Sequence, residues 1–422
     1  MSASVQKGKV RASVLVTGAA QVLSCAAGAP DLVGRIENGV VAIDGNRILA
    51  VGTAAEVERA VDTASAQVVD AGGGIVVPGF VDCHTHLVFA GSRVAEYAGR
   101  VHGESTASLK ARGVAVGITA TARMLRGAST EELLAQAHER LRHMLACGTT
   151  TVEAKSGYGL STAQELRMLE INASLARMQP VEVVSTLLGA HEFPEDRSRE
   201  DYLRDIIEEM VPEAARRGLA EFNDVYCDDG YYSVEESRRV LEAGISRGLR
   251  AKIHTDAYSH IGGSPLAAEL RAVSADHLNY ASDEDLVRLR EAGVVGVVMP
   301  ALDFAVAHVK PVRGRRMLEL GMEVALATDM CPGCWLESMS FVIQLACRQY
   351  GFSPAQALRA ATLGAARALA RGERVGSLEP GKQADLAIFG VPSFEDLAYR
   401  LGRGRARLVL KAGKVVFADT GA

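Results

Sequence analysis

Histidines in this 422-residue chain gather where apolar runs of strand length end. His84 and His86 form a His-x-His pair, and because side chains alternate along an extended strand, both imidazoles point to the same side. Such a pair alone is more typical of surface or satisfied core histidines, but further strand ends carry similar groups. These are His191, His254, His277 and Asp329. Several imidazoles with one carboxylate suit Zn²⁺ or Fe²⁺ rather than Mg²⁺ or Ca²⁺, so the sequence predicts a metal site here.

Eight apolar runs alternate with helical patterns between residues 78 and 372. The runs are Phe80–Asp82, Thr150–Ala154, Val181–Leu188, Glu221–Tyr226, Ala251–His254, Val273–Ala275, Val294–Met299 and Val324–Ala327. Helical patterns between them include Ala163–Ala176, Val234–Ile245 and Asp283–Glu291. This count and size predict an α/β fold, a (β/α)8 TIM-type barrel with its active site at the C-terminal strand ends. An open doubly wound sheet is the alternative. That fold would require a phosphate-binding glycine loop after its first strand, and the sequence has none there.

Both ends of the chain are typical of short strands with turns. The runs are Ser13–Val16, Val40–Asp44, Arg47–Val51, Gln67–Ala71, Ala384–Ile388, Leu408–Lys411 and Val415–Phe417. Asp44-Gly45-Asn46 is a hairpin signal between two of them. We therefore expect residues 1–77 and 373–422 to form one small β-sandwich domain beside a catalytic barrel of residues 78–372.

Composition excludes several classes of protein. The hydrophobic and charged fractions, 48% and 23%, are those of a soluble globular protein. A net charge of −5 argues against a nucleic-acid binder, and no apolar run is long enough to span a membrane. The first nine residues lack the apolar core of a signal peptide, and seven scattered cysteines do not indicate a disulfide framework. We expect a cytoplasmic protein.

The chain resembles the amidohydrolase superfamily and, within it, imidazolonepropionase of histidine degradation, over nearly its whole length. The segments that carry this resemblance are Phe80–Arg93, Glu153–Gly159, Leu188–His191, Lys252–Asp256, Ser274–His277, Ala327–Asp329 and Val375–Leu386. The resemblance implies one divalent metal ion, zinc rather than iron, and a small-molecule substrate that carries a carboxylate. It also implies a homodimer.

Specific roles follow from the resemblance for five residues. By it, His84, His86, His254 and Asp329 ligate the metal, and the water that the metal activates attacks a ring carbon. His277 is implied to stabilise the developing oxyanion. Asp329 is also a candidate for moving the proton.

Substrate-binding roles follow in the same way for a second group. Arg93, Tyr158 and His191 match family positions that hold the substrate, and the planar guanidinium of Arg93 suits the propionate carboxylate. Otherwise Arg93 would fit a surface salt bridge, and the other two would fit barrel-rim packing. Thr106 stands where the family has a substrate-contacting tyrosine. Lys155 ends strand two, whereas the superfamily's carbamylated metal-bridging lysine ends strand four, which favours one metal over two.

The chain departs from the family pattern within the expected site. The family's His-x-x-Glu, whose glutamate transfers a proton, is His254-Thr-Asp-Ala257 here. The loop after Asp329 is Cys331-Pro-Gly-Cys334, which fits two reduced thiols, a disulfide switch or a second metal site. Asp303 and His308 are unexpected polar residues after strand seven, near the barrel mouth.

The missing glutamate leaves several functions open. Ring opening expels a nitrogen that needs a proton, whereas sulfide leaves with little protonation. The first hypothesis is hydrolysis of the imidazolone ring of imidazolone-5-propionate. The alternative is desulfuration of its 2-thioxo analogue, 3-(5-oxo-2-thioxoimidazolidin-4-yl)propionate, in ergothioneine breakdown. An inactive metal-binding homologue and a nucleobase-type deaminase are less favoured. The deaminase is disfavoured because nucleobase deaminases of the superfamily also require the glutamate.

Overall fold

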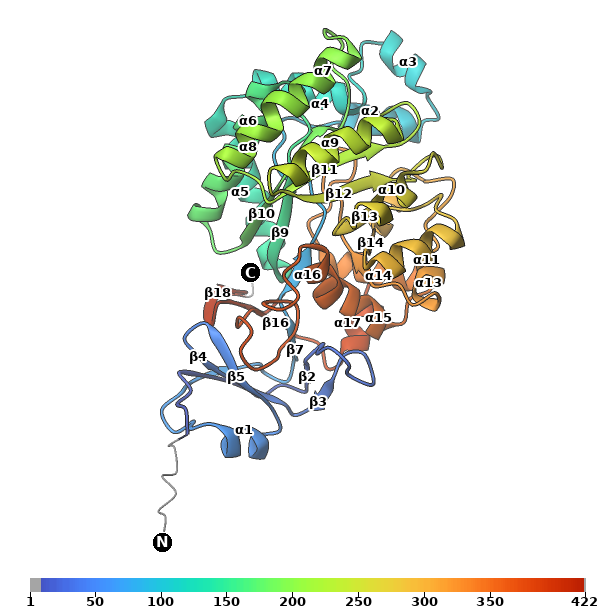
Figure 1. The fold of residues 1–422 in the computed structure, drawn as a ribbon. Helices are drawn as coiled ribbons and strands as arrows, with labels where there is room; N and C mark the ends of the chain where they lie inside the picture. Colours follow the sequence, from blue (N-terminus) through green and yellow to red (C-terminus); the bar gives the residue numbers. More distant parts are fainter. Residues whose placement is uncertain (1–8, 421–422) are drawn as a thin grey trace.

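A parallel eight-stranded sheet forms the centre of the computed structural model, which describes residues 9–420 (Figure 1). Its strands follow chain order and pair in parallel with their neighbours. They are β8 (Phe80–Asp82), β9 (Thr149–Lys155), β10 (Glu182–Ala190), β11 (Phe222–Cys227), β12 (Arg250–Thr255), β13 (Ser274–His277), β14 (Val295–Val298) and β15 (Val324–Leu326). All eight predicted strands are present, which confirms the TIM-type barrel.

The first and last strands meet at their C-terminal ends. Thr328 donates to both carboxylate oxygens of buried Asp82, with its backbone N at 3.1 Å and its Oγ1 at 2.6 Å. Beyond this contact, Asp329 N donates to His84 O and His86 N donates to Met330 O, at 3.1 and 2.9 Å. This closure places the segment of His84 and His86 beside the segment of Asp329, two of the three segments with expected metal ligands.

Helices surround the barrel, and several begin with a capping box that their sequence encodes. Ser129, Ser233 and Ser282 each accept from the backbone of the third helical residue, whose side chain bonds back. The helices that follow the first strand are α2 (Val94–Val101), α3 (Thr106–Ala111), α4 (Gly117–Gly127), α5 (Thr130–Ala146), α6 (Thr162–Met178), α7 (Arg199–Asp205), α8 (Val211–Arg216), α9 (Val234–Ser246), α10 (Gly263–Glu269), α11 (Asp283–Ala292), α12 (Pro300–Ala305), α13 (Gly314–Glu319), α14 (Met339–Gln349), α15 (Pro354–Arg359), α16 (Ala365–Ala368) and α17 (Phe394–Tyr399). Two π-helical turns also occur: η1 (Ile206–Met210) lies between α7 and α8, and η2 (Ala360–Gly364) lies between α15 and α16.

The two ends of the chain come together in two further sheets beside the barrel (Figure 1). One has the order β5-β4-β1-β6, and the other has the order β18-β17-β16-β7-β2-β3, which mixes strands from both ends. The strands are β1 (Val14–Thr17), β2 (Gln21–Leu23), β3 (Arg35–Glu37), β4 (Val40–Asp44), β5 (Arg47–Gly52), β6 (Gln67–Asp70), β7 (Ile75–Pro78), β16 (Leu386–Phe389), β17 (Leu408–Lys411) and β18 (Lys414–Ala418). Helix α1 (Ala54–Ala60) packs on β4 and β5. The expected small β domain from both ends is confirmed.

Three of these strands, β2, β3 and β7, were not expected from the sequence. Only Gly79 separates β7 from β8, and there the chain passes from the six-stranded sheet to the barrel, next to the expected domain boundary. A Cβ at Gly79 would lie 2.3 Å from Thr150 Oγ1, so only glycine fits this crossing. Within residues 9–420, no helix is long and apolar enough to cross a bilayer. The first eight residues, which belong to the N-terminal segment that lacks the apolar core of a signal peptide, lie outside the described region.

Candidate metal centre

Five imidazoles and one carboxylate converge at the C-terminal end of the barrel strands. His84 and His86 follow β8, His254 lies in β12, and Asp329 follows β15. Asp329 Oδ1 lies 3.7 Å from His84 Nε2 and 3.6 Å from His86 Nε2. Donor atoms of His84, His254 and His277 also lie within 4.8 Å of one another. The four expected ligands and the expected oxyanion-binding histidine therefore form one cluster.

The cluster has the properties of a metal site. His84 Nε2, His254 Nε2 and Asp329 Oδ1 are buried and have no hydrogen-bond partner within residues 9–420. Buried polar atoms are normally paired, so these three fit a bound cation. Burial lowers the pKa of His84 and His254 well below the ordinary value, which keeps both rings neutral with lone pairs available. The donor set fits a divalent metal ion.

Two buried carboxylates lie behind the candidate histidine ligands. His84 Nδ1 lies 2.6 Å from Asp276 Oδ2, and an ionised carboxylate only accepts, so Nδ1–H donates and Nε2 faces the cluster. His254 Nδ1 lies 3.1 Å from Asp224 Oδ2 without the alignment of a good hydrogen bond. Neither aspartate was identified from the sequence, although Asp276 directly precedes His277 in β13 and Asp224 lies in β11, the neighbour of the strand that carries His254.

The backbone is strained at two of these positions. His277 has φ +82° and Asp329 has φ +49°, in the left-handed region that non-glycine residues rarely adopt. Such strain gathers at functional sites because the surrounding structure enforces it. Here the closed barrel holds both side chains toward the cluster.

An aromatic wall lines one side of the cluster. His191 stacks on His86 with ring centroids 4.8 Å apart, and Tyr158 lies 5.4 Å from both rings. His191 Nδ1 lies 3.1 Å from Gly157 O, and burial lowers the pKa of His191 to about 4, so the ring is neutral at pH 7. Tyr226, which was not identified from the sequence, lies 5.7 Å from His254 at the end of β11. These groups border the space in which a ring substrate would bind.

Arg93 uses one edge of its guanidinium group for an ion pair with Glu96. Its Nε and Nη2 donate to Glu96 at 2.6 and 2.9 Å, so one edge of the guanidinium is occupied. Glu96 also accepts from Arg100 Nε and from the backbone of Gly117, which fixes it in place. The remaining nitrogen, Nη1, faces Gly333, where an added Cβ would lie 3.5 Å away. Any carboxylate must therefore bind at Nη1 and the outer side of Nη2.

Thr106 is exposed at the start of α3 and accepts from Arg100 Nη2 at 3.2 Å. It reaches Arg93 only through Arg100 and Glu96, and no described contact joins it to the histidine cluster. The structure thus brings together the other expected site residues but leaves Thr106 on the periphery.

The backbone at position 257 is clamped from two sides. Asp228 Oδ2 accepts from the backbone N of Ala257 and Tyr258 at 2.8 and 2.9 Å. His308 accepts from Lys310 N at Nδ1, and its Nε2 therefore donates to Ala257 O at 3.0 Å. His308 has both nitrogens occupied, so it acts as a structural support rather than a free proton donor.

Asp303 is also committed to structural bonds. It accepts from Asn279 Nδ2 at 2.9 Å, from Val312 N at 3.1 Å and from the Tyr350 hydroxyl at 2.5 Å. These bonds tie α12 to the segments that follow β13, precede α13 and follow α14. Asp303, a polar residue that was unexpected near the barrel mouth, therefore serves as a structural acceptor in this geometry.

The Cys-x-x-Cys segment forms a tight turn. Cys331 and Cys334 exchange two backbone hydrogen bonds of 3.1 Å, and both thiols are free and buried. Burial raises the pKa of Cys331 to about 12, and its thiol lies beside the Tyr158 hydroxyl. Reactive cysteines have lowered pKa values, so this environment favours two protonated thiols over a redox pair.

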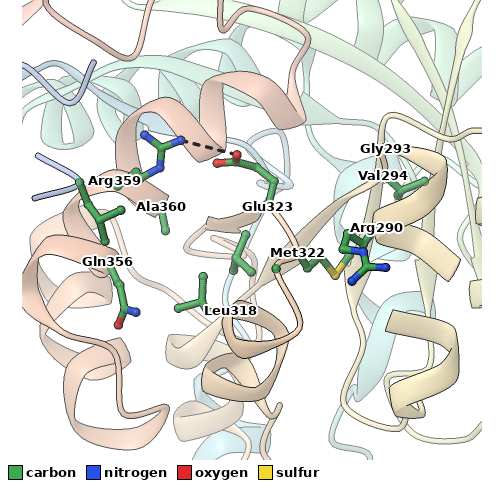
Figure 2. Close-up of a pocket in the computed structure, with 12 residues that line it drawn as sticks. Arg290, Gly293, Val294, Leu318, Met322, Glu323, Gln356, Arg359 and Ala360 are labelled. Carbon is green, nitrogen blue, oxygen red and sulfur yellow. Dashed lines mark ion pairs between the residues drawn. The ribbon is translucent and has the colours of Figure 1, made fainter. Parts of the chain in front are cut away.

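A cavity of about 380 Å³ lies at the opposite end of the barrel, where β14 and β15 begin (Figure 2). Its charged groups are paired, because Glu323 contacts Arg359 at 3.7 Å and also Arg367, and Arg290 contacts Glu291 at 2.9 Å. It contains none of the orphaned polar atoms of the histidine cluster. The cluster at the strand C-termini therefore remains the candidate site.

Comparison with known proteins decides the family. The model of the amidohydrolase family matches residues 75–416. The chain belongs to the amidohydrolase family. Imidazolonepropionase of Geobacillus kaustophilus is 47% identical over 391 residues, which are 92% of each chain. The same enzyme of Symbiobacterium thermophilum is 47% identical over 386 residues, 90% of each chain. These relatives confirm the resemblance to imidazolonepropionase. This member of the amidohydrolase family is therefore an enzyme, a hydrolase.

Solved structures confirm the fold of this amidohydrolase. A zinc-bound adenosine deaminase from Xanthomonas campestris superimposes with a TM-score of 0.70 at 20% identity, over 97% of this chain and 94% of that chain. A zinc complex of atrazine chlorohydrolase from Arthrobacter aurescens gives 0.68 at 19% identity, over 96% and 95%. At such identities the likeness concerns the arrangement of barrel and small β domain alone.

Proposed function

We propose that this amidohydrolase opens the ring of imidazolone-5-propionate by metal-dependent hydrolysis. The observation that carries the proposal is the orphaned histidine–aspartate cluster in a chain 47% identical to imidazolonepropionases. One Zn²⁺ is the preferred ion, held by His84, His86, His254 and Asp329. When bound, it supplies Lewis acidity that activates water at neutral pH.

The side chains around this ion have separate tasks. His277 lies beside the ligand cluster, with its ring centroid 5.3 Å from that of His254, and donates to the oxyanion that develops on the attacked carbonyl. Asp329 takes the proton of the attacking water and delivers it to the leaving nitrogen, since position 257 offers no carboxylate. Tyr158 and His191 orient the ring, and the open side of Arg93 binds the propionate.

A second candidate is favoured by one observation. Ala257 is buried and offers no proton donor where the family has glutamate, and neither Asp303 nor His308 replaces it. Water addition to the C=S carbon of the 2-thioxo analogue expels sulfide, so C=S becomes C=O with little need for an acid. The same cluster and the same Arg93 would serve this substrate.

Direct assay distinguishes the two. Purified, zinc-loaded protein is incubated with each of the two propionates, and ring absorbance and free sulfide are followed. Ring opening of the imidazolone without sulfide release from the analogue supports the first function. Faster sulfide release supports the second, and turnover of neither ring leaves the inactive homologue.

We expect Arg93→Lys to raise KM for a propionate-bearing substrate by about 10-fold or more, because hydrogen bonds to charged groups contribute roughly 1.5–3 kcal/mol. A lysine keeps the charge but loses the planar fork. Steady-state kinetics with the same ring lacking the propionate should show a much smaller effect. Arg100→Lys is the matched control, because Arg100 shares Glu96 from the exposed side. Equal losses on both substrates would show that Arg93 is structural.

A further inference from the structure

A layer of charged side chains lies directly beneath the histidine cluster, inside the barrel. Its members are Glu153, Lys155, Asp224, Lys252 and Asp276, and none of their side chains is exposed. When all five are ionised they leave one net negative charge.

Lys155 is the centre of this layer. Its Nζ lies 2.7 Å from Asp224 Oδ2, 3.4 Å from Asp276 Oδ2 and 3.1 Å from Glu153 Oε2. Two of these carboxylates are the ones that contact metal ligands, since Asp276 Oδ2 lies 2.6 Å from His84 Nδ1 and Asp224 Oδ2 lies 3.1 Å from His254 Nδ1. One ammonium group thus joins the supports of two ligands.

Lys252 provides the contrast within the same layer. Its Nζ lies 2.8 Å from Glu153 Oε2 and donates to Cys83 O at 3.2 Å. It has the same charge and the same burial as Lys155. Neither of its two hydrogen-bond partners is a carboxylate that supports a histidine ligand.

The position of Lys155 also bears on the number of metal ions. Asp224, His254 and Asp276 present donor atoms within 4.8 Å of one another, as a second cation site would. The ammonium group of Lys155 contacts both of these aspartates. It takes the place of a second cation there.

We propose that Lys155 is a positioning residue of the metal centre, a built-in cation that fixes His84 and His254 through Asp276 and Asp224 and keeps the centre mononuclear. Groups that orient metal ligands from behind typically contribute 10–100-fold to metal affinity. The inference rests on the proposed metal centre and not on the choice of substrate.

The test compares Lys155→Met with Lys252→Met in the full-length protein. Zn²⁺ affinity is measured by competition with a chromophoric chelator, and ligand geometry is followed by the visible spectrum of the Co²⁺-loaded protein. We expect Lys155→Met to weaken Zn²⁺ binding by about 10–100-fold and to alter the Co²⁺ bands. Lys252→Met should lower the melting temperature of the metal-free protein similarly but keep the wild-type affinity and spectrum.

Equal losses of metal affinity in both variants, or wild-type affinity in Lys155→Met, would overturn the inference. If Lys155→Met does not fold, Asp224→Asn is compared with Glu153→Gln in place of the two lysine variants. Asp224→Asn should then weaken Zn²⁺ binding, and Glu153→Gln should not. Wild-type protein that binds one Zn²⁺ but turns over neither ring overturns the proposed function and leaves this comparison valid. Wild-type protein that binds no Zn²⁺ overturns the metal centre and the inference together.

Discussion

Replacing His254 with alanine should lower kcat by at least about 10³-fold, because a catalytic metal contributes several kcal/mol and each 1.36 kcal/mol is tenfold. Within residues 9–420, His254 contributes donor atoms to three of the four groups that could hold a cation. Metal analysis should find well below one ion per chain. Chelation of the wild type should have the same effect, and added Zn²⁺ should restore its activity.

His260→Ala is the matched control for this experiment. His260 follows the same strand, but its Nε2 contacts Asp285 at 2.8 Å and its side chain is 45% exposed. It should retain metal and activity. Full activity in a verified metal-free preparation would refute the metal-dependent mechanism.

Restoring a carboxylate with Ala257→Glu should shift the preference between the two rings. General acid–base help is worth about 10²–10⁴-fold, so imidazolone opening should gain up to that factor relative to sulfide release. The backbone at 257 is held by Asp228 and His308, which fixes where the new side chain starts. The ratio of kcat/KM on the two propionates measures the shift.

Ala257→Gln is the control, since it has nearly the size of glutamate but donates no proton to the leaving nitrogen. Glutamine should leave the ratio close to that of the wild type. If the wild type already opens the imidazolone rapidly and releases no sulfide from the analogue, position 257 does not decide the reaction. Asp329 would then be the remaining candidate for the proton transfer.

The barrel and the gathering of histidines at its end could be predicted from the sequence because both depend on short-range pattern, whereas the choice of His84, His86, His254 and Asp329 as ligands came from the family resemblance. Eight apolar runs separated by helical patterns suffice for the strand count, and alternation along a strand places His84 and His86 on one side. Parallel strands of a barrel end at a common edge, so His254 and Asp329 had to lie near that pair. Their confirmed clustering needs no knowledge of side-chain contacts.

The small β domain was predictable only in part. Hairpin signals identified β4 and β5, and the expected domain boundary lies next to Gly79, but β2, β3 and β7 were missed. A Cβ at position 79 would meet Thr150, which restricts the crossing between the two sheets to glycine. Steric limits of this kind come from another segment of the chain.

Only the tertiary structure decided how the site is supported. Asp276 reaches His84 across 192 residues of sequence, and Lys155 joins two carboxylates from different strands. The occupied edge of Arg93 depends in the same way on the fixed place of Glu96. Sequence patterns identify which types of group reach the barrel end, but hydrogen bonds and charge pairs depend on distances of a few ångströms between distant segments. Those distances are set by packing of the whole barrel.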